Sequence, residues 1–147
     1  MTSVSVPIVR LTPAAALPER FSSGASGMDL AASLADAVHL EPGAFRLVPC
    51  GVALAIPAGY EGQVRPRSGL ASRHGVTVLN TPGTIDSDYR GEVQVLLINL
   101  GPAPFLIEPG MRIAQLVVTP VVRVDWEVAP SLPASTRGAG GFGHTGA

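Results

Sequence analysis

Residues 83–93, GTIDSDYRGEV, place several chemically active side chains between two apolar runs. We predict a hairpin here, with its turn at Gly83–Thr84, that presents Asp86 beside the edge of a sheet. A carboxylate on a rigid β-scaffold can act as a general base when a water lies within its reach. Tyr89 follows three residues later and could offer its ring face to a base or a sugar. Asp86 and Tyr89 are therefore candidates for a site that binds a small ligand and activates water.

The other charges of this segment have a plainer interpretation. Arg90 and Glu92 have the spacing of an ordinary cross-strand ion pair. A solvated hairpin closed by such a pair would carry the same residues, since charged turns are common on protein surfaces. The segment alone leaves both interpretations open.

A basic segment at residues 64–76, VRPRSGLASRHGV, has the composition of a phosphate site. It contains three arginines around a serine and a glycine: Arg65, Arg67, Arg73, Ser68 and Gly69. Arginine donates paired hydrogen bonds to phosphate, serine adds a hydroxyl, and glycine lets backbone N–H groups approach an anion. A basic loop whose arginines pair with carboxylates elsewhere in the fold would look the same.

The C-terminal residues 131–147, SLPASTRGAGGFGHTGA, are small, polar and rich in glycine, which predicts a mobile tail. GAGGFG at 138–143 matches G-x-G-x-x-G and begins a near match to the Walker A pattern. Both matches fail as nucleotide-fold fingerprints, because each needs a strand before it and a helix after it. Chemically, Arg137, the glycine N–H groups and Thr145 could wrap a polyphosphate while Phe142 stacks on a base. A disordered tail is the alternative.

Composition argues against several classes of protein. The chain has 147 residues, the size of one domain, and 46% of them are hydrophobic. The low charged fraction, 14%, favours burial of some surface between subunits. The net charge of −1 argues against general binding of nucleic acid. We expect no signal peptide, and no apolar run approaches the length of a membrane helix.

Cysteine and histidine do not form a recognisable metal or catalytic motif. The single cysteine, Cys50, rules out an internal disulfide framework and fits a reducing compartment. The histidines, His39, His74 and His144, show no metal-ligand spacing with it, so we expect no zinc site built by the protein. No serine–histidine–aspartate motif is present either.

Short runs rich in Val, Ile and Leu alternate with proline–glycine turns, a pattern typical of an all-β sandwich or barrel. These turns are EPG at 41–43, PAG at 57–59, TPG at 81–83 and EPG at 108–110. Residues 25–40, ASGMDLAASLADAVHL, are the one helix-like stretch, and Gly27 and the mixed pattern leave that assignment open. Trp126 belongs to a strand-like run and is expected in the core or in an interface.

Five segments occur in a particular order along the chain: ASGMDLAA, PRSGLASRHGV, GTIDSDYRGEV, GMRIAQLVV and RGAGGFGHTG. In sequence and separation they resemble the five motifs of the trimeric dUTPases, the deoxyuridine triphosphate nucleotidohydrolases, from about residue 25 to 146. The resemblance implies a distorted single-domain β jelly roll, of barrel or sandwich form, at residues 1–130. It also implies a homotrimer with three active sites, each built from three subunits. Residues 131–147 would form a flexible arm that closes over the active site.

The same resemblance implies a cytoplasmic hydrolase of nucleotide metabolism. Its small-molecule substrate would be dUTP and its cofactor Mg²⁺, with no nucleic-acid or membrane partner. The products would be dUMP and pyrophosphate. Such an enzyme keeps uracil out of DNA and supplies dUMP for thymidylate synthesis.

Roles in base and sugar recognition follow by position in the motifs. Asp86 resembles the catalytic carboxylate that activates the attacking water at the α-phosphorus. Asn80 resembles the residue that reads the Watson–Crick edge of uracil. The backbone of residues 80–85, with Thr84 and Ile85, would complete that pairing and leave no room for the thymine methyl. Tyr89 resembles the residue that packs on the deoxyribose and excludes a 2′-hydroxyl.

The phosphate and metal roles fall on further residues. Arg67, Ser68 and Gly69 resemble the phosphate cradle, and Gln115 resembles the residue near the α-phosphate and the metal shell. Asp29 resembles the acid that holds the hydration shell of Mg²⁺, so it would act on the metal through water. Such a metal arrives on the triphosphate with few direct protein ligands. In the arm, the γ-phosphate clamps and the lid over uracil would be Arg137, Gly143, His144, Thr145 and Phe142.

Three positions depart from the family pattern. Met28 replaces an aromatic residue before Asp29, and Met111 replaces a frequent acid. Both fit a role in packing. His144 replaces a common serine beside Thr145, where an imidazole can still donate a hydrogen bond, more strongly when protonated.

Two other functions stay open at this point. A dCTP deaminase would share the fold, but it needs a carboxylate at the C4 edge of the pyrimidine, and EVQVLLIN at 92–99 has no acid in its later part. A non-catalytic jelly-roll trimer that binds nucleotides or a protein is the second, because one fold hosts many functions. Loss of Asp86 or of the arm would favour it, and both are present.

Overall fold

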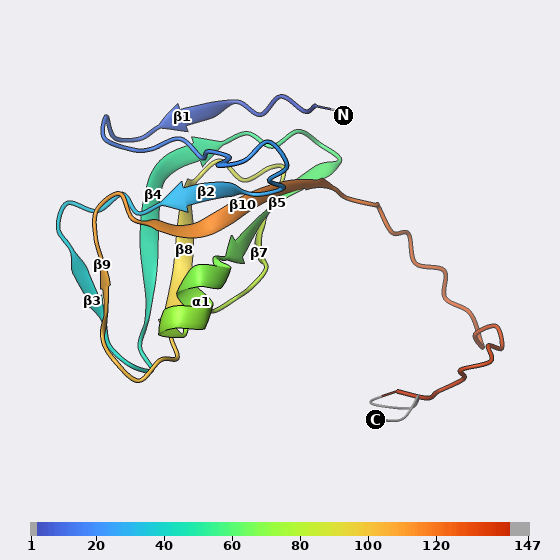
Figure 1. Ribbon diagram of the computed structural model, residues 1–147. Helices are drawn as coiled ribbons and strands as arrows, with labels where there is room; N and C mark the ends of the chain where they lie inside the picture. The colour runs from blue at the N-terminus through green and yellow to red at the C-terminus, as the bar shows by residue number, and fades with distance from the viewer. Residues whose placement is uncertain (1–2, 142–147) are drawn as a thin grey trace.

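The computed structural model describes residues 3–141. Over these residues the chain forms two four-stranded sheets, a two-stranded sheet and one short helix, as Figure 1 shows. The strands are β1 (Ile8–Arg10), β2 (Met28–Ala31), β3 (Val38–Leu40), β4 (Phe45–Leu54), β5 (Tyr60–Pro66), β6 (Val76–Val78), β7 (Gly83–Ile85), β8 (Glu92–Asn99), β9 (Phe105–Ile107) and β10 (Arg112–Pro120). The helix, α1, spans Ser68–His74. The prediction of an all-β chain is confirmed.

The first sheet has the antiparallel order β1-β4-β8-β6 and supplies much of the core. β8 shows the period of two that a strand imposes. Val93, Val95 and Leu97 are buried, whereas Gln94 between them is exposed. The buried side chains of this sheet join those of the second sheet in one apolar cluster.

The second sheet has the antiparallel order β2-β10-β5-β7, and it carries four of the predicted site residues, Asp29, Thr84, Ile85 and Gln115. On β5, Gly62 and Val64 face the core, so Glu61, Gln63 and Arg65 face outward. The segment that contains α1 follows β5 directly. No helix within residues 3–141 is long and apolar enough to cross a membrane.

The proline–glycine segments form turns where the chain enters β4, β5 and β10. In the two EPG segments the glycine has a φ of 77° at Gly43 and 76° at Gly110, the left-handed value that a type II turn requires. The backbone N–H after each glycine donates to the glutamate carbonyl three residues earlier, over 3.0 and 3.1 Å. PAG at 57–59 closes in the same way, with a φ of 83° at its glycine.

Two details differ from the sequence predictions. Residues 25–40 contain no helix. They form β2 and β3 instead. The predicted turn at Gly83–Thr84 is wrong, because Gly83–Ile85 is the strand β7, paired with β5. Buried Ile85 and the close packing of Gly83 on Val64 hold this segment extended. The chain turns at 79–82 instead, passing from β6 in one sheet to β7 in the other.

Asn99, at the end of β8, is the fully buried polar residue that joins three segments. Its amide nitrogen donates to the carbonyls of Leu40 and Ala103 over 2.8 and 2.9 Å. Its amide oxygen accepts from the Gly101 N–H over 2.9 Å. The side chain is therefore fully engaged in holding one end of the fold.

After β10 the chain leaves the body of the molecule, as Figure 1 shows. Residues 121–141 contain no helix or strand and are exposed almost throughout. Trp126 is 90% exposed, so the expectation that it could belong to the core of its own chain is wrong. An interface with another chain remains the prediction for it.

Cys50 lies on β4 and is almost fully buried. Burial raises the pKa of its thiol from 9.0 to about 12, and the nearby charge of Glu92 raises it further. The Glu92 carboxylate is held there because its Oε1 accepts from the Gly51 N–H over 2.8 Å. The thiol is thus kept protonated and unreactive in the folded protein.

We predict that Cys50 makes the protein less stable in alkali. Its pKa is higher in the folded state than in the unfolded chain, so its contribution is complete below pH 9 and falls as the pH rises toward 12. Between pH 9 and pH 11 the loss should be roughly 2 kcal/mol. Denaturant unfolding at these two pH values would measure it. The chain has no lysine, which leaves few other groups that titrate in this range. An equal loss in Cys50→Ala would contradict the prediction.

Candidate active site

Many of the predicted site residues fall into two groups, and the first surrounds the buried carboxylate of Asp29. We call its members, Asp29, Arg67, Arg112 and Gln115, the Asp29 cluster. Arg112 Nη1 donates to Asp29 Oδ2 over 3.0 Å, and Gln115 Nε2 donates to Oδ1 over 2.9 Å. Arg67 Nη2 lies 3.4 Å from Oδ2. Two guanidiniums thus share one carboxylate, and the cluster carries a net positive charge.

Three elements bring these side chains together. Asp29 on β2 is paired with Gln115 on β10, so both side chains lie on the same face of the sheet. Arg67 follows β5 and has an extended backbone, and its carbonyl accepts from the N–H groups of Leu70 and Ala71 at the start of α1. Ser68 and Gly69 form the first turn of that helix, next to the cluster. The structure therefore brings Asp29, Gln115 and the basic segment into one region.

Arg112 was missed as a site residue in the sequence analysis, although it lies in the fourth motif. Its guanidinium lies 4.2 Å from the centroid of the Phe21 ring, a cation–π distance. Its backbone carbonyl accepts from Arg67 Nη1 over 2.8 Å, which couples the two arginines. Phe21 carried no sequence signal, because an aromatic ring outside the motifs becomes informative only when its partner is known.

Gly27 allows the side chain of Gln115 to lie where it does. A Cβ at Gly27 would lie 3.1 Å from Gln115 Oε1 and 3.2 Å from its Cδ. At these distances the Gln115 side chain would have to shift by a few tenths of an ångström. Gly27 therefore matters for the space that it leaves beside Gln115, rather than for a backbone conformation that favours glycine.

The second group lines a shallow pocket of about 230 Å³, which we call the Asp86 pocket. It brings together four predicted site residues, and its lining is Leu47, Thr84, Ile85, Asp86, Tyr89, Glu92, Val93 and Gln94. Asp86 is exposed, and its carbonyl accepts from the Tyr89 N–H over 3.1 Å. The Tyr89 hydroxyl donates to the Glu92 carbonyl over 2.9 Å.

The expected ion pair between Arg90 and Glu92 is not formed within the chain. Arg90 Nη1 donates to the carbonyls of Ser87 and Tyr89 over 2.7 and 2.8 Å. Glu92 instead accepts from the Gly51 N–H. Each of these two charged side chains therefore binds backbone groups instead of the other side chain.

Within a single chain, the Asp29 cluster and the Asp86 pocket lie apart. Ile85 is paired with Gly62 in the antiparallel pair β5–β7, so Asp86 lies level with Glu61, six residues before Arg67, which follows the end of β5. A strand rises about 3.3 Å per residue, so Asp86 and Arg67 are separated by roughly 20 Å along the direction of β5.

Two further predicted residues lie outside both groups. Asn80 is exposed and lies near Gly83, where its Nδ2 would be 3.4 Å from an added Cβ. Arg137 is exposed on the C-terminal segment and donates to the Gly140 carbonyl over 2.7 Å. Phe142, Gly143, His144 and Thr145 lie outside the described residues.

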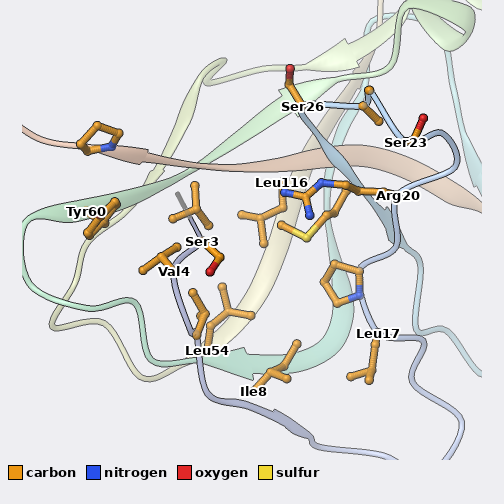
Figure 2. Close-up of a pocket in the computed structure, with 17 residues that line it drawn as sticks. Ser3, Val4, Ile8, Leu17, Arg20, Ser23, Ser26, Leu54, Tyr60 and Leu116 are labelled. Carbon is orange, nitrogen blue, oxygen red and sulfur yellow. The ribbon is translucent and has the colours of Figure 1, made fainter. Parts of the chain in front are cut away.

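A larger cavity of about 960 Å³ lies elsewhere, between the N-terminal segment and the β2–β10 edge, as Figure 2 shows. Its lining is mainly apolar and includes Val4, Ile8, Leu17, Leu54, Tyr60 and Leu116, with Arg20 as its charged member. It contains none of the predicted site residues.

No three His, Cys, Asp or Glu side chains are grouped as metal ligands anywhere in residues 3–141. The Asp29 carboxylate already holds three protein donors, one of them an arginine at 3.0 Å. Each carboxylate oxygen can accept two hydrogen bonds, so Asp29 keeps capacity for one or more water molecules. These residues would suit an ion that arrives with a ligand and keeps its bound waters, rather than an ion that the protein binds directly through several side chains.

Comparison with known proteins places the chain in a family. The sequence profile of the dUTPase family matches residues 14–146. The deoxyuridine 5'-triphosphate nucleotidohydrolase of Chlamydia pneumoniae is 58% identical over 132 residues, which cover 89% of this chain and 91% of that one. The corresponding protein of Syntrophotalea carbinolica is 53% identical over 146 residues, 99% of each chain. The chain therefore belongs to the dUTPase family.

A solved structure agrees over the whole chain. The dUTPase of Staphylococcus bacteriophage 80alpha, solved with dUpNHpp, matches with a TM-score of 0.89. Its sequence is 26% identical, and the match covers 99% of this chain and 100% of that one. The fold is thus retained at half the sequence identity of the bacterial relatives.

Replacing Asp29 tests whether the cluster holds its elements together. Asp29→Asn removes the charge that the two arginines share, and we expect it to lower the free energy of unfolding by about 2 kcal/mol. Both guanidiniums reach solvent, so the cost should be below that of a fully buried pair. Denaturant titration measures it, with Asp36→Asn as the control because Asp36 is exposed. Equal stability of the two variants would show that the cluster is not structural.

Proposed function

We propose that this chain hydrolyses dUTP to dUMP and pyrophosphate, with Asp86 activating the water that attacks the α-phosphorus. The observation that carries the proposal is the Asp86 pocket, in which an exposed carboxylate and an aromatic ring line one cavity of about 230 Å³. Relatives at 53–58% identity bear the name of this activity. A carboxylate within reach of water on a rigid loop meets the geometric need of a general base.

In this proposal the pocket and its rim bind the nucleoside. Asn80 reads the Watson–Crick edge of uracil, and the backbone around Thr84 and Ile85 completes the pairing. The strand conformation of Gly83–Ile85 supports that role, because it fixes these backbone groups beside β5. Tyr89 packs on the deoxyribose, and its ring is anchored through the hydroxyl to the Glu92 carbonyl.

The Asp29 cluster is proposed to bind the triphosphate. Its net positive charge attracts an anion, and Arg67 lies 3.4 Å from Asp29 while Arg112 lies 3.0 Å away. Arg112 thus binds the carboxylate more closely than Arg67 does. N–H groups of Arg67 are therefore available to donate to phosphate. Ser68 and Gly69 contribute the first turn of α1, and Gln115 lies beside Asp29. Aligned charges of this kind lower the barrier to attack at phosphorus.

The substrate is proposed to be the Mg²⁺ complex of dUTP. Asp29 would hold the ion through one of its waters, consistent with its carboxylate being occupied by protein donors. The ion would neutralise charge on the triphosphate. Magnesium usually keeps several waters, so the lack of a three-acid cluster in the described part of the chain agrees with this role.

The active form is proposed to be a homotrimer with sites shared between subunits. A general base must lie within hydrogen-bond reach of its water, whereas Asp86 and Arg67 of one chain are separated by roughly 20 Å. A second copy would bring the two halves together. The outer face of the first sheet supports such packing, because Phe45 and Leu47 are 63% and 51% exposed. They pair with Ile98 and Leu96, and Leu47 also lines the Asp86 pocket.

The C-terminal segment supports contact between copies as well. Val122, Val124, Trp126 and Val128 alternate with charged residues and are 59–97% exposed. Exposed apolar side chains that alternate in this way need a partner surface, and residues 3–141 of the same chain do not cover them. We propose that residues 1–130 form the jelly-roll domain and that residues 131–147 close over the site.

Within that arm, Arg137, Gly143, His144 and Thr145 would clamp the γ-phosphate, and Phe142 would cover uracil. Closure of such an arm only after substrate binds would exclude water late in the reaction cycle. The proposed cellular role is in the cytoplasm, where the enzyme would limit uracil in DNA and supply dUMP.

Pyrophosphate release from dUTP, dTTP, dCTP and UTP, each with Mg²⁺, tests the proposed activity. We expect fast release from dUTP alone, because the pocket rejects both the thymine methyl and the 2′-hydroxyl. Ammonia should be followed in the dCTP sample. Its appearance would assign the protein to the deaminases instead, and no release from any of the four would favour a binding protein.

Asp86→Asn tests the role of the base. An amide cannot take a proton from water, so kcat for dUTP should fall at least about a hundredfold. Binding of dUpNHpp, measured by calorimetry, should stay near the wild-type value. Asp88→Asn is the matched control, since Asp88 is exposed in the same turn and does not line the Asp86 pocket. Undiminished turnover by Asp86→Asn would remove Asp86 from the mechanism.

A further inference from the structure

We infer that Gly91 determines specificity, because its missing side chain sets the position of the Tyr89 ring and thereby the preference for deoxyribose over ribose. This inference rests on the proposed function, in which Tyr89 packs on the sugar. Gly91 does not line the Asp86 pocket and belongs to no strand. Any influence of Gly91 on the pocket would therefore be exerted through Tyr89.

The space that a side chain at Gly91 would need is already filled by Tyr89. A Cβ on Gly91 would lie 2.6 Å from the ring Cζ and 3.0 Å from Cε2, and it would lie closest to the hydroxyl oxygen. Real Cβ atoms essentially never approach other heavy atoms within 3.0 Å. The φ of Gly91 is not in the left-handed region, so alanine suits the backbone there. The requirement for glycine is thus one of space alone.

The ring has little freedom to accommodate such a side chain while it stays in place. The Tyr89 hydroxyl donates to the Glu92 carbonyl over 2.9 Å, and the Tyr89 N–H donates to the Asp86 carbonyl over 3.1 Å. Its own carbonyl accepts from Arg90 Nη1 over 2.8 Å. These contacts fix the residue at both its backbone and its ring tip. An alanine at 91 must therefore break the hydroxyl contact and displace the ring.

A displaced ring need not unfold the protein. Tyr89 is 45% exposed, so its side chain can turn into solvent without opening the core. Displacement of the ring would change the wall of the Asp86 pocket, which Tyr89 helps to form. Since this wall is the one proposed to meet the 2′ position, the effect should fall on sugar discrimination.

The test is the selectivity ratio, kcat/KM for dUTP divided by kcat/KM for UTP, in Gly91→Ala. We expect the ratio to fall about tenfold, a size typical of losing one steric contact. The matched control is Gly24→Ala, because a Cβ at Gly24 meets no heavy atom within 4 Å. An unchanged ratio in an active, folded Gly91→Ala protein would overturn the inference.

A double-mutant cycle distinguishes action through Tyr89 from a general effect on the loop. In a Tyr89→Ala background the overlap no longer exists, so adding Gly91→Ala should leave the selectivity ratio unchanged. A further fall would overturn the inference. If Gly91→Ala alone does not fold, the double variant should fold again, and its failure to do so would also count against the inference.

The same variants separate this inference from the proposed activity. If wild-type protein hydrolyses none of the nucleotides, the proposed function fails. The preference of Gly91→Ala for dUpNHpp over UpNHpp, measured by calorimetry, still decides the role of Gly91. A preference equal to that of the wild type would overturn it, and a loss confined to Gly91→Ala would support it.

Discussion

The carboxylate of Asp29 is the contact on which the arrangement of the candidate site depends. It is buried on β2, and it holds side chains from β10 and from the segment after β5. A buried carboxylate without partners would be costly, so the chain is constrained to bring these three elements together. The single negative charge of Asp29 neutralises only one of the two arginine charges. The contact that stabilises the fold therefore leaves a net positive charge at the surface. In the proposed function, folding and phosphate recognition therefore depend on the Asp29 carboxylate.

The antiparallel pairing of β5 with β7 has a second effect on the site. It places the Asp86 pocket near one end of β5 and Arg67 beyond the other end, so the two groups of candidate site residues lie apart within one chain. In the proposed trimer this geometry ties activity to assembly. A monomer could bind one part of a nucleotide, but it could not align the attacking water with the phosphate that the arginines hold.

Local patterns predicted the local features of this fold. The proline–glycine segments at 41–43, 57–59 and 108–110 gave the turns, because their conformation depends on residues within the turn. The turn at Gly83–Thr84 was wrong because TPG has the same local signal, and pairing with β5 overrides it. Asp29 and Asp86 were predicted as site residues because the segments that contain them resemble family motifs. Arg112 and Phe21 were not, since the Arg112–Asp29 contact joins residues 83 positions apart and no local pattern reveals such a partner.

The burial of Cys50 has a practical meaning for chemical labelling. The chain contains no lysine, and its one thiol is enclosed in the core and held protonated. The folded body therefore presents neither an ε-amine nor a thiolate to electrophilic reagents. A cysteine introduced on the exposed segment after β10, for example at Ser135, would be the single reactive thiol of the native protein. A fluorophore or spin label at that position would report on the arm alone, without the background that most proteins impose.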